Sequence, residues 1–305
     1  MENWSLLERY IQYLEDKGRK PGTVKQYVSD LKQFITWLDS TADREQDLLK
    51  IDGAHIEAYT ALLNEKKLSR ATIKRHLSAI NRLLAYYRID HVMPEHHTTD
   101  YSAPPLKRSD FVTIHEMHQL LTSMKRPIGS AARDILIHRN LAIVHLIRYK
   151  GFRPKEVSLI NMNMINMGQS QIALDLYDPE PVYHLSDEHM QYIRDYLQTI
   201  DAPKRPRRQS SDPLFVAFNN RSNHYQFDYE LVKPKRLSVR GIQKMIKEEV
   251  QHAGIRKLSA KHLRNSCILE HVMRGYDEKD IQSYFHLTHP HSLYRYKEYG
   301  ISENP

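Results

Sequence analysis

The stretch HRNLAIVHLIRYKGFRPKEVSLI, residues 138–160, is the most informative part of the chain. An apolar helix is predicted through its first half and ends at Gly151, which makes a tight turn. Arg153 follows this turn, where a second helix begins. An arginine at such a place can simply start a surface helix, so its meaning depends on the rest of the chain.

The composition favours two domains and a polyanionic partner. With 305 residues, 40% of them hydrophobic, the chain is long enough for two domains that each bury a core. Its formal net charge is +8, since lysine and arginine outnumber aspartate and glutamate. Nucleic acid is the commonest partner of such a chain. A basic protein without a polyanionic partner is the alternative that charge alone leaves open.

The single cysteine, Cys267, cannot form an internal disulfide, and the chain does not open with a charged segment followed by an apolar one. No apolar run approaches the ~18 residues needed to cross a bilayer. We therefore expect a cytoplasmic protein without a membrane partner.

Residues 1–90 predict a compact domain of four helices. Residues 18–22 separate the first two helices, and Asp52 and Ser69 are the expected N-caps of the third and fourth. The apolar residues of the first two helices recur at helical spacing: Leu6, Leu7, Tyr10, Ile11, Leu14, Val24, Tyr27, Leu31, Phe34 and Leu38.

Basic residues gather on the polar faces of the second and fourth of these helices. They are Lys25 and Lys32 in one helix, and Arg70, Lys74, Arg75 and Arg82 in the other. A solvated polar face is the plain explanation of either set alone. Two such faces in one domain suit DNA phosphates better.

Residues 91–109 predict an extended linker, because they lack apolar periodicity and contain three prolines. The histidines His91, His96 and His97 raise the alternative of a metal site. No cysteine or patterned carboxylate accompanies them, so we expect no metal.

Residues 110–305 predict a second domain that is mainly helical. Short alternating apolar runs on either side of Asp178-Pro179 indicate a β-hairpin from Gln171 to Leu185, and a helix is expected near residues 187–197. The loop that follows carries clustered basic residues, Lys204, Arg205, Arg207 and Arg208. It is either a flexible loop beside DNA or a disordered surface loop.

The second domain resembles the tyrosine recombinases, also called phage integrases. The resemblance rests on residues 138–160 and on the block LSVRGIQKMIKEEVQHAGIRKLSAKHLRNSCILEHVMRGYDEKDIQSYFHLTHPHSLYRYKEY, residues 237–299. It implies a mainly α fold with a small β-hairpin or sheet. A helical, SAM-like core-binding domain would occupy residues 1–90, a linker residues 91–109, and a catalytic-type domain residues 110–305.

Individual residues match the catalytic motifs of that family. Arg153 matches the first catalytic arginine and Glu156 the acidic residue that supports it, while Arg264 matches the second arginine and Tyr296 the nucleophile. Lys261 replaces the histidine of the usual His-x-x-Arg motif, and His262 is displaced from it by one place.

The resemblance also implies the chemistry. A tyrosine attacks a DNA phosphate and forms a 3′-phosphotyrosyl bond, without a metal or nucleotide cofactor. Two arginines bind the non-bridging oxygens and neutralise the charge of the transition state. A lysine on the hairpin protonates the leaving oxygen, which typically contributes about 10²- to 10⁴-fold in rate.

The chain departs from this pattern in the hairpin and near the nucleophile. No lysine lies between Lys155 and Lys204, so the hairpin cannot supply the general acid, and Tyr177 or Asp178 stands about where that lysine should be. We therefore expect the acid to be missing. Nine residues before Tyr296, where the family has histidine or tryptophan, the chain has a leucine, Leu287, with His286 next to it. Tyr294 and Tyr299 are further tyrosines that could serve as nucleophile or pack in the core.

Two functions follow from these matches and departures. The favoured hypothesis is a sequence-specific binder of double-stranded DNA without recombinase activity, acting as a transcriptional regulator or repressor of a phage or mobile element. The alternative is an active site-specific recombinase in which Lys261 is the acid and His286 or His289 supplies the imidazole. The expected phosphate ligands of this domain are Arg153, Lys261, His262 and Arg264.

The sequence leaves the oligomeric state and a third class of function open. A homo-oligomer on DNA is one possible state. A helical interaction module that binds no DNA explains the helices but leaves the arginine motifs without a purpose.

Overall fold

The computed structural model describes residues 2–19, 21–40, 47–89, 92, 104–287 and 291–303. The chain divides into two units, Met1–Ala103 and Pro104–Pro305. The predicted domain boundaries at residues 90 and 110 lie on either side of this division.

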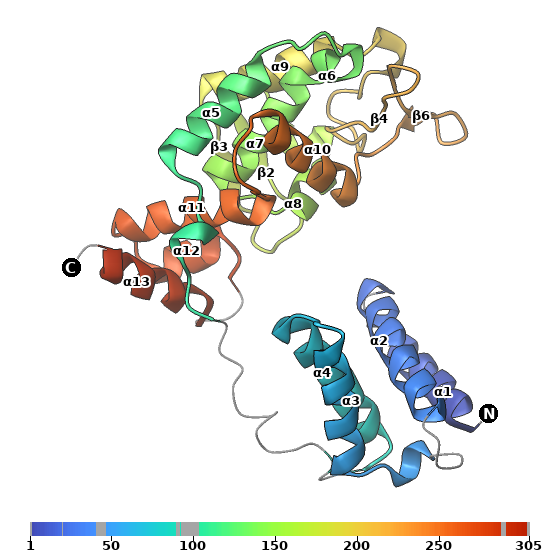
Figure 1. Cartoon of the computed structure of the whole chain (residues 1–305). Coiled ribbons are helices and arrows are strands. Elements are labelled where there is room, and N and C mark those ends of the chain that lie inside the picture. The colour runs from blue at the N-terminus through green and yellow to red at the C-terminus, as the bar shows by residue number, and fades with distance from the viewer. Residues whose placement is uncertain are drawn as a thin grey trace. The chain divides into compact units, whose positions relative to one another are not determined.

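The first unit is built from helices in its described residues (Figure 1). They are α1 (Glu2–Asp16), α2 (Pro21–Ser40), α3 (Gly53–Glu65) and α4 (Arg70–Tyr86), with a short 3-10 turn η1 (Leu48–Lys50) before α3. The expected N-caps are confirmed. The side chain of Asp52 accepts a hydrogen bond from the backbone of His55, and that of Ser69 accepts one from Thr72, each at 3.2 Å.

The apolar periodicity of the first unit predicts its core correctly. Leu31, Phe34 and Leu38 are completely buried on α2, and Tyr59 of α3 packs edge-on against Phe34 with ring centroids 5.0 Å apart. Burying each such side chain stabilises the fold by about 1.5–3 kcal/mol. The predicted positions Ile11 and Tyr27 are only partly buried and pack against this core from outside.

The second unit is mainly helical, with three small antiparallel sheets in its described residues. Its helices are α5 (Ile114–Lys125), α6 (Ala131–Ile135), α7 (Ile137–Lys150), α8 (Pro154–Leu159), α9 (Asp187–Gln198), α10 (Val239–His252), α11 (Ala260–Met273), α12 (Glu278–Tyr284) and α13 (His291–Glu303). The strands are β1 (Ile165–Asn166), β2 (Gln171–Ala173), β3 (Val182–His184), β4 (Phe218–Asn219), β5 (His224–Tyr225), β6 (Phe227–Asp228) and β7 (Lys233–Pro234).

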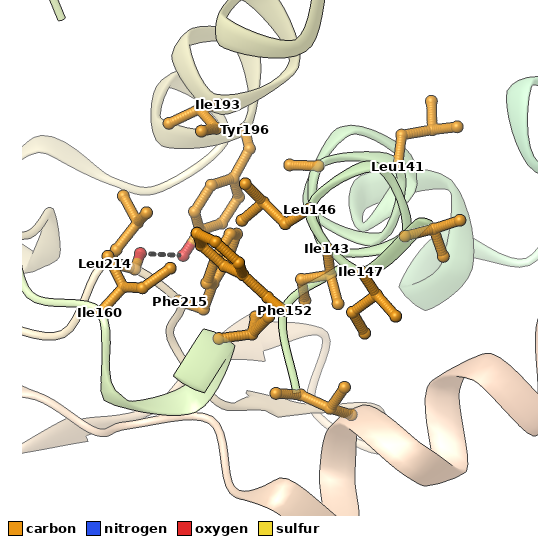
Figure 2. Close-up of a cluster of buried hydrophobic side chains, with 14 of the residues drawn as sticks. Leu141, Ile143, Leu146, Ile147, Phe152, Ile160, Ile193, Tyr196, Leu214 and Phe215 are labelled. Atoms are coloured by element: carbon orange, nitrogen blue, oxygen red, sulfur yellow. Dashed lines mark hydrogen bonds between the residues drawn. The ribbon is translucent and has the colours of Figure 1, made fainter. Parts of the chain in front are cut away.

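Helix α7 is the centre of this unit, where it contacts α5, α9, α10 and α11. Its apolar residues are buried almost all round, as the unbroken run in residues 138–160 predicts. Figure 2 shows Leu146 and Ile147 of α7 in the cluster that also contains Phe152 and Tyr196. The hydroxyl of Tyr196 donates to the carbonyl of Leu214 at 3.0 Å, so this buried polar group is satisfied.

The predicted hairpin is present. Strands β2 and β3 pair antiparallel with Ile172 opposite Tyr183, and β1 adds a third strand that the sequence did not predict. The helix expected near residues 187–197 is α9. The basic loop after it is tied back to the protein rather than loose, since Arg205 donates to the carbonyl of Ile200 and Arg207 makes two bonds of 2.8–2.9 Å to Asp212.

A separate apolar cluster joins the start of the second unit to its last helices. Leu106 and Phe111, which flank the 3-10 turn η3 (Arg108–Asp110), are buried in this cluster together with residues of α11, α12 and α13. The cluster contains Tyr296, so the environment of this tyrosine depends on the segment that follows the first unit.

Candidate functional site

The turn after α7 positions the first arginine of the site. Gly151 ends α7 with φ of 67°, in the left-handed region that favours glycine. A Cβ atom added there would lie 2.3 Å from Cε1 of Phe285, so no other residue fits without moving that ring. The chain then enters α8 with Arg153 as its N-cap, whose backbone N–H donates to Oε2 of Glu156 at 2.6 Å.

Glu156 holds both predicted arginines in place. Its buried carboxylate accepts a hydrogen bond from Nη1 of Arg153 at 2.7 Å and lies 3.9 Å from Nη1 of Arg264. Arg264, on α11, also donates to the carbonyls of Gly151 and Phe285, the latter at 2.6 Å. The structure therefore brings together two residues that are 111 positions apart in the sequence, 153 and 264.

A pocket of about 890 Å³ opens beside these arginines, between α8, α10 and α11. Five cationic residues line it: Arg153, Lys247, Lys257, Lys261 and Arg264. None of the described residues along its wall is acidic. A pocket with this lining attracts anions, and phosphate oxygens suit the planar guanidinium groups best. Sequence motifs predicted three of the five cations but missed Lys247 and Lys257.

His262 lies outside this lining. Its ring nitrogen Nδ1 is 3.0 Å from the backbone nitrogen of Ser259 and 2.8 Å from the hydroxyl of the same residue. Burial is the main reason that the pKa of His262 is lowered. In the described structure this imidazole caps the start of α11, and its predicted contact with phosphate stays a prediction.

A stacked pair of rings closes the other side of Glu156. The hydroxyl of Tyr177, from the turn between β2 and β3, donates to Oε1 of Glu156 at 2.5 Å. Its ring stacks on that of His286 with centroids 3.4 Å apart and planes 9° apart. The carbonyl of His286 accepts from Nη2 of Arg153 at 3.0 Å, and its Nε2 lies 3.0 Å from the hydroxyl of Tyr183.

His286 occupies an unusual backbone position, with φ of 49°. Few residues other than glycine adopt this region, and the stack on Tyr177 helps to hold the histidine there. The neighbouring Leu287 packs against the apolar cluster that contains Tyr296, and its side chain offers no hydrogen bond to a phosphate. His289 lies outside the described residues.

The candidate nucleophile Tyr296 is 8% exposed. Its hydroxyl donates to Oδ1 of Asn265 on α11 at 2.8 Å. Burial raises the pKa of Tyr296, while the charge of Arg264 acts in the opposite direction. Of the other two tyrosines on α13, Tyr294 is 58% exposed and Tyr299 packs against Phe111 with ring centroids 4.5 Å apart.

The predicted basic residues of the first unit have different surroundings. Lys25, Lys32 and Arg70 are exposed and Lys74 is half-buried. Arg75 makes hydrogen bonds of 2.7 and 2.9 Å to buried Asp30, which joins α2 to α4. Two of the five donors of Arg75 are thus engaged within the protein. All five residues remain predicted DNA ligands.

Within the described residues, no group of three or more His, Cys, Asp or Glu side chains is arranged to hold a metal ion. The histidines 91, 96 and 97, which raised that alternative, lie outside those residues. In the same part of the chain, no helix has the length and apolarity that a membrane span requires.

Two family sequence models match the chain and together cover most of it. Residues 7–88 match the phage integrase N-terminal SAM-like domain, and residues 110–299 match the phage integrase family.

Curated relatives match over nearly their whole length. Tyrosine recombinase XerD of Staphylococcus saprophyticus is 22% identical over 281 residues, which span 91% of this chain and 88% of that protein. Tyrosine recombinase XerC of Lacticaseibacillus casei is 23% identical over 324 aligned positions, which span 97% of this chain and 98% of that protein.

Solved structures share the fold. The Tn1549 transposon integrase in complex with transposon right-end DNA has a TM-score of 0.67, with 10% identity and 98% coverage of both chains. The XerH site-specific recombinase bound to a difH substrate has a TM-score of 0.65, with 17% identity over 95% of this chain and 79% of that one. A lambda integrase dimer bound to a COC′ core site has a TM-score of 0.61, with 14% identity over 96% and 94%. At these identities the likeness establishes the mainly α, two-domain fold.

Proposed function

Since the chain belongs to the phage integrase family of tyrosine recombinases, we propose that it binds double-stranded DNA at a specific site and recombines it. The observation that carries the proposal is the pair Arg153 and Arg264, held by Glu156 at the edge of a cationic pocket. The named relatives that span most of the chain are recombinases, which favours strand exchange over mere occupation of DNA.

The chemistry proposed for this site is attack of Tyr296 on phosphorus. The two guanidinium groups bind the non-bridging oxygens and stabilise the negative charge that develops on them. Lys261, which lines the same pocket, adds a third positive charge. A covalent bond then joins the oxygen of Tyr296 to the 3′-phosphate of the cleaved strand, and the freed 5′-hydroxyl can later attack it to rejoin DNA.

Tyr296 has to leave its present hydrogen bond before it reacts. Its hydroxyl is buried and bonded to Asn265, so α13 or the side chain must move when DNA binds. The protein without DNA therefore holds the hydroxyl of Tyr296 buried and hydrogen-bonded.

DNA is proposed as the partner of both units, with assembly of several copies on one DNA site. Exposed lysines on α2 and arginines on α4 suit phosphates in the first unit, and the cationic pocket suits them in the second. The XerH and lambda integrase structures are described as DNA complexes, the latter as a dimer, which supports this arrangement.

The proposal is tested by capture of covalent adducts. The full-length protein is incubated with a pool of duplexes that have randomised centres, then denatured, and DNA that stays attached to protein is sequenced. We expect one enriched sequence with the wild type and with Tyr294→Phe, and none with Tyr296→Phe. A wild type that enriches no adduct, although native gels show specific binding, would contradict strand cleavage.

That contrary result would favour the second candidate, a transcriptional regulator of a phage or mobile element that binds DNA without cutting it. The observation behind this candidate is the hairpin without lysine, together with an apolar Leu287 near the nucleophile. A regulator should protect its site equally well in footprints of the wild type and of Tyr296→Phe.

A further inference from the structure

Breaking the bond between phosphorus and the 5′-oxygen of DNA produces an alkoxide, which needs a proton as it leaves. No lysine occurs on the hairpin or in the turn that joins its strands, residues 171–185. The donor therefore has to be another side chain near the two arginines, and a hydroxyl group on the same turn is one candidate.

Tyr177 brings a hydroxyl to this place. It lies on the turn between β2 and β3 and donates to the carboxylate of Glu156, which contacts both Arg153 and Arg264. The phenol is thus separated from both guanidinium groups by one shared carboxylate, although it does not itself line the cationic pocket. The stack on His286 fixes the plane of the ring, and the carbonyl of His286 is itself bonded to Arg153.

Burial and one hydrogen bond keep this phenol protonated. Burial, followed by the hydrogen bond to Glu156, raises the pKa of Tyr177 to about 12. The group thus carries its proton at neutral pH. Glu156 disfavours the phenolate that transfer would leave, and the charges of Arg153 and Arg264 act in the opposite direction.

We propose that Tyr177 is the general acid of strand cleavage, a role that rests on the proposed function. The bond between the oxygen of Tyr296 and phosphorus forms while the bond between phosphorus and the 5′-oxygen breaks. The proton of Tyr177 moves to the 5′-oxygen and leaves a phenolate, and the proton of Tyr296 passes to water. Rejoining reverses each transfer, so the protein ends in its starting state.

Lys261 is the competing donor. It lines the cationic pocket on α11 and is exposed, whereas Tyr177 is half-buried and contacts the carboxylate between the arginines. The phenol is held in one orientation by Glu156 and His286, whereas the ammonium group lies at the end of a long flexible stem. We therefore assign Lys261 to phosphate binding.

The experiment compares two leaving groups. The DNA sequence enriched in adduct capture is prepared with an ordinary 5′-oxygen and with a 5′-sulfur at the cleaved bond. A thiol with a pKa of about 8.5 leaves as its anion, without a proton. Cleavage of both duplexes is followed on denaturing gels for the wild type, Tyr177→Phe, Lys261→Met and Tyr192→Phe. The last variant removes a hydroxyl from α9, where it bonds Glu188 outside the cationic pocket.

We expect Tyr177→Phe to cut the oxygen substrate about 10²- to 10⁴-fold more slowly and the sulfur substrate at nearly the wild-type rate. Lys261→Met should slow both substrates alike, because it removes a phosphate ligand, and Tyr192→Phe should slow neither.

Other outcomes overturn the assignment in different ways. Equal loss on both substrates in Tyr177→Phe would make the tyrosine a structural residue, and no loss on either would remove it from the site. Selective rescue of Lys261→Met by sulfur would transfer the role to that lysine. A wild type that cuts only the sulfur substrate would show an intact nucleophile with no acid, and one that cuts neither would overturn strand cleavage itself.

Discussion

The side-chain oxygen of Asn265 accepts a hydrogen bond from the hydroxyl of Tyr296, the candidate nucleophile. Its amide nitrogen donates in turn to the carbonyl of Asp110 at 3.1 Å, so the same residue ties α11 to η3. A neutral hydrogen bond contributes about 1 kcal/mol net to stability. This interaction would be lost if Tyr296 moved toward a phosphate as proposed, so it opposes that movement.

The strength of this hydrogen bond can be measured without any DNA. In urea unfolding at pH 7, Asn265→Ala, Tyr296→Phe and the double variant should give a coupling free energy of about 1 kcal/mol. Where release of Tyr296 limits the rate, Asn265→Ala should also form adduct about fivefold faster, since 1.4 kcal/mol corresponds to a factor of ten. Strictly additive effects on stability would show that the contact contributes nothing.

Arg264 should matter more for affinity than Tyr296 does. Arg264→Ala removes charge-assisted contacts and should weaken binding to the selected duplex by about 1.5–3 kcal/mol. Tyr296→Phe removes one hydroxyl and should leave affinity nearly unchanged. Fluorescence anisotropy measures both, with the exposed Arg274→Ala as a control for loss of charge alone. An effect of Arg274→Ala as large as that of Arg264→Ala would contradict a specific site.

The sequence predicted the arginine pair but not the ring stack beside it. Arg153 and Arg264 stand in recognisable motifs, so their meeting could be expected. The contact of Tyr177 with His286 joins a strand turn to the turn after α12, 109 positions later, and nothing in the local pattern of either segment encodes it. The left-handed backbone conformation of His286 could not be predicted either, because this conformation is expected of glycine.

Helices and strands differ in how well their sequences predict them. Helices such as α2 and α9 span several turns, so their apolar residues repeat often enough to reveal a period. The strands β1 and β4 to β7 have only two residues each, too few to show alternation. The hairpin β2–β3 was predictable because Asp178-Pro179 marks its turn.

The packing of α7 against α9 should weaken in acid. His145 of α7 is 3% exposed and faces His189, with Glu188, Lys125 and the rings of Tyr149 and Tyr192 around it. Burial, followed by the charge of His189, lowers the pKa of His145 to about 3. Between pH 6.5 and about 3 the unfolded chain therefore binds a proton that the folded protein does not, and stability falls as the pH falls.

Replacement of this histidine tests that interface. His145→Phe should reduce the loss of unfolding free energy on acidification, by up to about 1.4 kcal/mol per pH unit within this window. The matched variant His184→Phe, at an exposed position of β3, should keep the wild-type slope. Thermal or urea unfolding between pH 7 and pH 4.5 measures the difference, and parallel slopes for all three proteins would rule out His145 as the cause.

The whole chain should hold DNA through both of its units. Each phosphate contact contributes about 0.9 to the slope of log K against log salt for B-DNA. Lys32→Ala, in the first unit, and Lys257→Ala, in the second, should therefore each lower the slope measured for the full chain by about 0.9. Lys244→Ala is the control, because this lysine lies 3.6 Å from Glu248 on α10 and outside the cationic pocket. An unchanged slope for Lys32→Ala would remove its face of α2 from the interface.

The start of the second unit packs in the same apolar cluster as the candidate nucleophile. Leu106 and Phe111 share one apolar cluster with Tyr296, and Asp110 accepts the hydrogen bond of the asparagine that restrains this tyrosine. The start of the second unit is therefore part of the packing around Tyr296, so a substitution at Leu106 or Phe111 would reach this tyrosine without any change in α13 itself.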